Sequence, residues 1–84
     1  MVLADGSSYE GEYQRGQRHG KGKYTTDNGI VLITGWEAGR PVGQGVQWSA
    51  DRAQAWELQD GTPGRSISLD EAAQIAARVG LPVP

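Results

Sequence analysis

Residues 8–26 alternate between aromatic or glycine positions and charged positions, and this period of two predicts a β-hairpin closed by a Gly-rich turn. In the register that satisfies both faces, one face pairs rings and glycines: Tyr9 with Tyr24, Gly11 with Gly22, and Tyr13 with Gly20. The other face pairs opposite charges: Glu10 with Lys23, and Glu12 with Lys21. A slip of one residue would spoil both faces, so the pattern favours this single register.

The same alternation returns over residues 31–49, but one face is now apolar. The glycine side pairs Trp36 with Gly43, Thr34 with Gly45, and Leu32 with Gln47. The side that is charged in the first hairpin pairs Ile33 with Val46 and Val31 with Trp48. We therefore expect a sheet with one glycine-rich face and one face that becomes hydrophobic toward the C-terminus.

Short loops of one kind are expected between the hairpins. Asp27-Asn28-Gly29 has the form of a three-residue loop with Gly in the left-handed conformation, and Ala4-Asp5-Gly6 is the same loop one period earlier. Ala50-Asp51-Arg52 follows one period later. Arg at its last position costs about 1 kcal/mol if the left-handed geometry is kept.

One further strand and a helix are expected after the second hairpin. Continuing the register over 53–59 places Trp56 and Leu58 on the apolar face. A capping box over 68–71 begins a helix from Leu69 to Val79, which Gly80 and Pro82 stop. Its apolar stripe consists of Leu69, Ala72, Ala73, Ala76 and Val79, with Ile75 at the margin. The sheet face that it would cover consists of Ile33, Val46, Trp48, Trp56 and Leu58. The helix is thus expected to close the array as a terminal cap.

The glycines recur at a fixed step of 23 residues, which indicates a repeat architecture. Three glycines and one aromatic position return in order: Gly16, Gly20, Gly22 and Tyr13 as Gly39, Gly43, Gly45 and Trp36. The motif does not return after Trp56, so the third unit is expected to be a single strand. The predicted division is one domain over 1–84, with a first full repeat and an upstream repeat tail at 3–26, a second repeat at 27–49, a partial third at 50–61 and a helical cap at 62–84.

Composition excludes several classes of function. A formal net charge of −2 over 84 residues gives no global basic field for nucleic acid or anionic lipid. The absence of Cys excludes disulfides and thiolate metal sites, and the single histidine, His19, has no nucleophile or second ligand placed beside it. We therefore expect no catalytic, cofactor or metal site. The N-terminus lacks the pattern of a signal peptide, so we expect an intracellular, cytoplasmic location.

The first repeat resembles the MORN repeat (membrane occupation and recognition nexus), through Tyr9-Glu10-Gly11-Glu12-Tyr13, Gly16 and His19-Gly20-Lys21-Gly22. The second repeat keeps Trp36 and its three glycines but has Leu32, Thr34 and Val42 where the family has Tyr, Gly and His. The resemblance implies a mainly β fold: an antiparallel β-meander or solenoid of MORN-type hairpins, here with one C-terminal capping α-helix. Asp5-Gly6 would be the tail of an upstream repeat, so we expect a piece of a longer array or an abrupt start.

The resemblance also implies a non-catalytic scaffold that binds a peptide or protein. The expected partner-binding residues form an aromatic–glycine groove: Tyr9, Tyr13, Tyr24, Leu32 and Trp36. Alternatively, these rings are structural and lie over glycines because nothing larger fits. A possible anionic contact consists of Arg15, Arg18 and Lys21, although a solvated hairpin tip is the simpler interpretation of these residues. Other open functions are membrane or phosphoinositide targeting, self-association as a homodimer, and an accessory region of a lysine methyltransferase or phosphatidylinositol-phosphate kinase.

Overall fold

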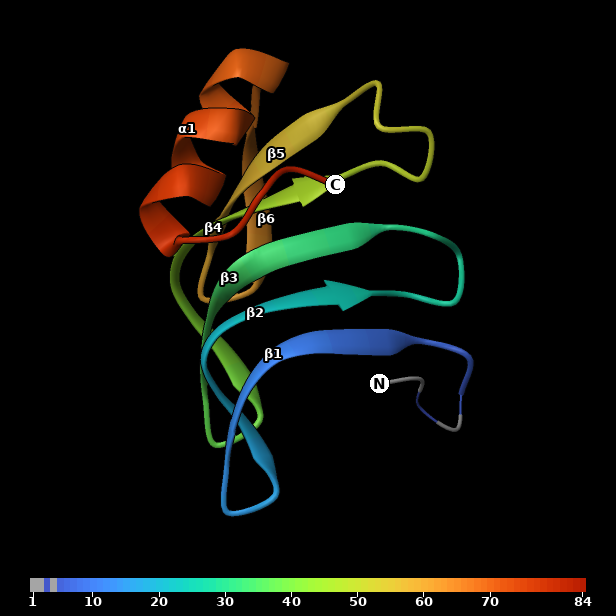
Figure 1. Ribbon diagram of the computed structural model, residues 1–84. Coiled ribbons are helices and arrows are strands. Elements are labelled where there is room, and N and C mark those ends of the chain that lie inside the picture. Colours follow the sequence, from blue (N-terminus) through green and yellow to red (C-terminus); the bar gives the residue numbers. More distant parts are fainter. Residues whose placement is uncertain (1–2, 4) are drawn as a thin grey trace.

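A computed structural model describes residue 3 and residues 5–84, and shows a mainly β protein with one C-terminal helix. Six antiparallel strands follow one another across a single sheet in sequence order, which confirms the expected meander (Figure 1). The elements are β1 (Ser8–Gln14), β2 (Gln17–Thr25), β3 (Val31–Glu37), β4 (Arg40–Trp48), β5 (Ala55–Gln59), β6 (Thr62–Ile67) and α1 (Leu69–Val79).

Each of the three hairpins closes through a two-residue turn in which both residues have positive φ. The turns are Arg15-Gly16, Ala38-Gly39 and Asp60-Gly61. This is the type I′ geometry, whose twist matches that of the flanking strands. The third hairpin corrects the expectation of a single strand in the third unit, because β6 pairs with β5. Asp-Gly is a favoured type I′ pair, but β6 lacks the glycine motif that marks the earlier hairpins.

In the first two hairpins, the predicted register is correct in the half that lies away from the turn. The confirmed pairs are Tyr9–Tyr24, Glu10–Lys23, Gly11–Gly22, Val31–Trp48, Leu32–Gln47 and Ile33–Val46. Nearer the turns the prediction is wrong, since Tyr13 lies opposite Arg18 and Trp36 opposite Pro41. The pairing of Glu12 with Lys21 is also replaced: the Lys21 amide donates to the Glu12 carboxylate at 3.0 Å.

β-Bulges account for this difference. Between the pairs Gly11–Gly22 and Tyr13–Arg18, β2 contains two residues more than β1. In the second hairpin β4 likewise contains two residues more than β3 at the corresponding place. Gly20 and Gly43, with φ of 73° and 72°, take up the distortion. Bulges bend a strand and increase its twist. Figure 1 shows strands β1 to β4 bending sharply on the side of the sheet that leads to the first two hairpin turns.

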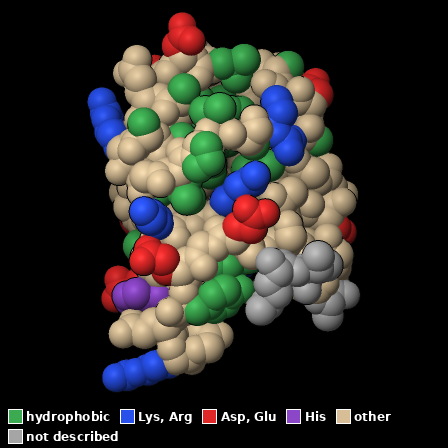
Figure 2. Space-filling model, viewed as in Figure 1, with side chains coloured by type: hydrophobic (Ala, Val, Ile, Leu, Met, Phe, Trp, Pro, Cys, Tyr) green, Lys and Arg blue, Asp and Glu red, His purple; other side chains and the backbone are tan. Residues whose placement is uncertain are grey.

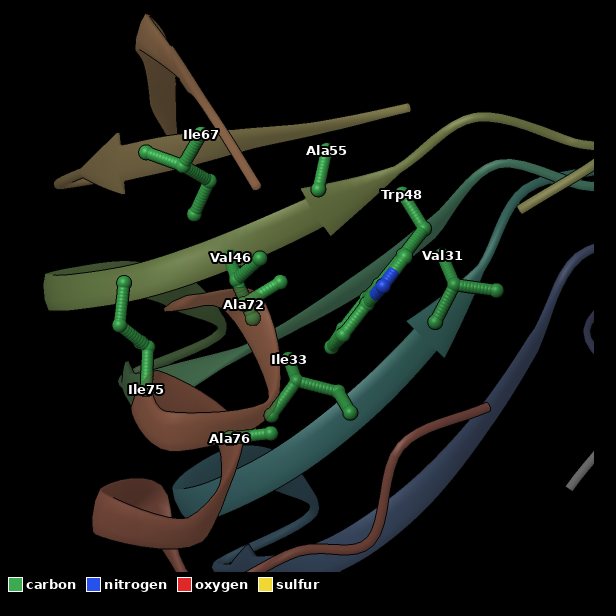
Figure 3. Close-up of a cluster of buried hydrophobic side chains, with 9 residues drawn as sticks. All are labelled: Val31, Ile33, Val46, Trp48, Ala55, Ile67, Ala72, Ile75 and Ala76. Carbon is green, nitrogen blue, oxygen red and sulfur yellow. The ribbon is translucent and has the colours of Figure 1, made fainter. Parts of the chain in front are cut away.

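A hydrophobic core lies between the sheet and α1, and Figure 3 shows its nine side chains. They are Val31, Ile33, Val46, Trp48, Ala55, Ile67, Ala72, Ile75 and Ala76. Trp56 and Leu58 were expected here, but they pair with Gln47 and Gly45 on the opposite, glycine face.

The reason for this inversion is the loop before β5. The Ser49 amide donates to the Gln54 carbonyl at 3.0 Å and encloses four residues, whereas the Thr26–Ile30 hydrogen bond of 2.8 Å encloses three. One additional residue turns every later side chain of the strand to the other face. Ala55 and, through β6, Ile67 therefore take the core positions.

The helix has the predicted bounds and caps. The Ser68 hydroxyl accepts from the Glu71 amide at 3.0 Å, and Gly80 ends the helix in the left-handed conformation. The buried stripe is shifted from the predicted one: Ile75 is 1% exposed, whereas Leu69 is 48% exposed. The sheet contacts the face around Ala72 and Ala76, where small side chains allow close approach, and Ile75 lies on that face.

Candidate functional site

Tyr9 lies against the backbone of the glycine face and is buried. A Cβ atom at Gly22 would lie 2.5 Å from Cε1 and Cζ of the Tyr9 ring, so the ring occupies the space that glycine leaves open. The Tyr9 hydroxyl donates to the Glu12 carbonyl at 2.9 Å. Burial raises the pKa of Tyr9 above its ordinary value. Tyr9 is 1% exposed, so its ring is buried within the glycine face and a partner cannot reach it.

Trp36 is buried beside Tyr9. Its indole Nε1 donates to the Gly22 carbonyl at 3.1 Å. Its ring meets the Tyr9 ring edge-on, with ring centroids 5.7 Å apart. The Tyr24 ring is tilted against it, with ring centroids 6.0 Å apart. Tyr24 and Leu32 lie opposite each other on the same face and are half-buried. The structure thus brings the predicted ring residues together, and packs the inner ones against each other.

Arg18 covers the ring cluster. Its guanidinium carbon lies 4.7 Å from the Trp36 ring centroid, 5.1 Å from that of Tyr24 and 5.9 Å from that of Tyr9. One of its NH₂ groups donates to the Gly39 carbonyl at 3.0 Å, across to the next hairpin turn. Cation–π contacts of this kind favour a fixed guanidinium. The predicted register leaves Arg18 in the hairpin turn and pairs Tyr13 with Gly20, so it does not predict this role. The bulge in β2 instead places Arg18 opposite Tyr13.

The accessible part of this face is a hollow beside the first two hairpin turns. Tyr13 is 43% exposed, and its ring meets the Tyr9 ring edge-on at 5.0 Å. An open hollow of about 320 Å³ lies next to it. The described residues that line it are Leu3, Tyr13, Gly16, Gln17, Arg18 and Gly39. Tyr13 and Arg18 are the two predicted site residues that line this hollow.

The three basic residues named as an anionic contact do not gather in one place. Arg15 is at the tip of the first turn, and Arg18 lies over the rings. Lys21 points toward the C-terminus of α1, where its Nζ lies 3.2 Å from the position that a Cβ of Gly80 would take. A cation is favourable at that end of a helix. On the face seen in Figure 2, basic and acidic side chains are interspersed.

Other polar groups serve the fold. Arg65 forms ion pairs with Glu71 at 2.6 Å and Glu57 at 3.9 Å, and both raise its pKa. Hydrogen bonds from Ser7 lower the pKa of Asp5. Residue 3 and residues 5–84 contain no group of three or more His, Asp or Glu side chains that could hold a metal ion. No helix in this described part of the chain is long and apolar enough to cross a membrane.

The fold and the site define a class of protein: a β-repeat protein in which successive bulged hairpins present one glycine-rich face. The MORN repeat family model matches residues 9–31 and 35–54, which is more than half of the 84 residues. The chain belongs to the MORN repeat family. This is a non-catalytic repeat family whose modules bind proteins or membranes. A comparison with curated proteins finds no match.

Proposed function

We propose that this chain is a non-catalytic protein-binding module that holds a peptide segment of its partner on the glycine face. The observation that carries the proposal is the hollow in which a half-exposed Tyr13 lies beside Arg18. Tyrosine supplies a large contact area at a small cost in conformational entropy. Recognition depends on a few such anchors near the centre of an interface.

The proposed contact surface is smaller than the groove expected from the sequence. Tyr9 and Trp36 support it from below, because both are nearly inaccessible and hydrogen-bonded to backbone carbonyls. Tyr13, Arg18 and the glycine backbones of the first two turns would contact the partner. Replacing Trp36 would therefore test stability, whereas replacing Tyr13 tests binding.

Selection of binders from a random peptide display library on the immobilised chain tests the proposal. We expect selected peptides to lose about tenfold or more in affinity for a Tyr13→Ala variant, since hot-spot truncations cost about 2 kcal/mol or more. Leu69→Ala is the matched control, because Leu69 is 48% exposed but lies at the start of α1. Near-UV circular dichroism would verify that both variants fold. Failure to select any peptide that depends on Tyr13 would refute the proposal.

A further inference from the structure

Arg18 is held in place by the protein but is not neutralised by it. Every ion pair among the described residues involves Arg65, so no carboxylate lies within ion-pair distance of Arg18. A guanidinium carries five N–H donors, and among the same residues only the Gly39 carbonyl accepts from it. The other N–H groups of Arg18 have no acceptor among these residues, and three aromatic rings partly shield the guanidinium from water.

The position of Arg18 makes these donors available in the hollow. Of the described residues that line the hollow, Arg18 alone is charged. Its surroundings are an aromatic ring, an aliphatic side chain, an amide side chain and glycine backbone: Tyr13, Leu3, Gln17, Gly16 and Gly39. The ring contacts and the hydrogen bond to Gly39 orient the guanidinium before any ligand arrives. A pre-oriented guanidinium loses less conformational entropy when it binds a carboxylate.

We infer that the hollow receives an Asp or Glu side chain of the partner segment, whose carboxylate accepts two N–H groups of Arg18. An adjacent apolar side chain of the same segment would pack against the exposed side of Tyr13. The inference rests on the proposed function, since it specifies the chemistry of the peptide that the glycine face holds. Charge-assisted, bidentate hydrogen bonds to a guanidinium are stronger than neutral ones.

A carboxylate fits this site better than a lipid phosphate. Phosphate and phosphoinositide head groups are recognised by clusters of basic residues. Here Arg15 lines a different part of the surface and Lys21 points to the end of α1, so among residue 3 and residues 5–84 one cation faces the hollow. A single positive charge matches the single negative charge of an acidic side chain.

The test uses the peptides selected on the full chain and a change on the peptide side. We expect acidic residues to be enriched among Tyr13-dependent binders. Replacing the acidic residue of such a peptide by its amide should weaken binding to the wild-type chain about tenfold, and to Arg18→Gln less than about twofold. This double-mutant cycle isolates the contact between the two groups. The peptide change alone decides the question if Arg18→Gln does not fold.

Controls separate this inference from simpler explanations. Arg15→Gln removes the same charge from the adjacent turn without altering the hollow, and should leave the peptide affinity within about twofold. Equal losses for Arg15→Gln and Arg18→Gln would overturn the inference in favour of a general charge effect. Tyr13-dependent peptides that bind equally well as acid and amide would also overturn it, while the proposed function would stand. Binding of phosphatidylserine vesicles that requires Arg18 would reassign the site to a lipid.

Discussion

The contact between Tyr9 and Gly22 is the most sensitive point of the glycine face, and Gly22→Ala tests it. A methyl group at Gly22 would lie 2.5 Å from two carbons of the Tyr9 ring. The ring has no room to withdraw, because it is 1% exposed and packs edge-on against the Trp36 ring at 5.7 Å. The substitution must therefore displace Tyr9 or separate β1 from β2.

The expected loss follows from two terms. Inserting a methyl group into a packed core costs about 1–3 kcal/mol. Displacing the ring also breaks the hydrogen bond from the Tyr9 hydroxyl to the Glu12 carbonyl, which contributes about 0.5–1.5 kcal/mol. We expect the free energy of unfolding to fall by about 2–4 kcal/mol. For a domain of this size that corresponds to a decrease in Tm of roughly 10–25 °C.

Urea unfolding followed by tryptophan fluorescence measures this loss, with Gly64→Ala as the matched control. A Cβ at Gly64 would lie 3.8 Å from the Glu57 carbonyl oxygen, in ordinary contact, so that variant should change stability by less than about 1 kcal/mol. In a Tyr9→Leu background the cost of Gly22→Ala should shrink by about 1 kcal/mol or more, because the obstructing ring is gone. Equal losses of stability for Gly22→Ala and Gly64→Ala would show that the Tyr9 ring does not depend on the space at Gly22.

Three further predictions concern the loop before β5 and the helix. Arg52 has φ of 65°, and its side chain donates to the Gly29, Ser49 and Ala50 carbonyls. Both Arg52→Ala and Arg52→Gly remove these hydrogen bonds, but only glycine relieves the left-handed strain, so the alanine variant should be about 1 kcal/mol less stable. Equal stability of the two variants in urea would contradict this. Ile75→Ala should lower the free energy of unfolding by about 2–4 kcal/mol and Leu69→Ala by less than about 0.5 kcal/mol, because Ile75 is buried and Leu69 is exposed. Calorimetry would show a smaller difference between the two variants if α1 were loosely packed against the sheet. Hydrogen bonds from the Ser49 hydroxyl and the Ala53 amide lower the pKa of Asp51 below 3.8, so their stabilisation is present above that pH and is lost as the pH falls through the folded-state pKa. In an Asp51→Asn variant the free energy of unfolding should therefore fall less as the pH is lowered. An unchanged pH dependence at acid pH would show that Asp51 does not contribute to it.

The candidate site was only partly visible in the sequence. Tyr13 and Trp36 were recognised because they precede matching glycines in the repeat, and both lie on the glycine face as expected. The sequence could not separate them, although Trp36 is 5% and Tyr13 43% exposed. Their difference in exposure depends on neighbours from another strand: the Trp36 indole donates to the Gly22 carbonyl, and the Arg18 guanidinium covers its ring.

The repeat, the strand pairing away from the turns and the helix with its caps could all be predicted from the sequence. These features depend on local rules: the alternation of faces, the preference of Gly for turns and the N-cap at Ser68. Three features became apparent only in the folded chain: the bulges at Gly20 and Gly43, the face on which Trp56 lies, and the position of Arg18 over the rings. The physical reason is that one or two additional residues in a strand or loop change which side chains meet. Local conformational preferences change little when one residue is added, whereas packing across the whole sheet determines where the additional residue is accommodated.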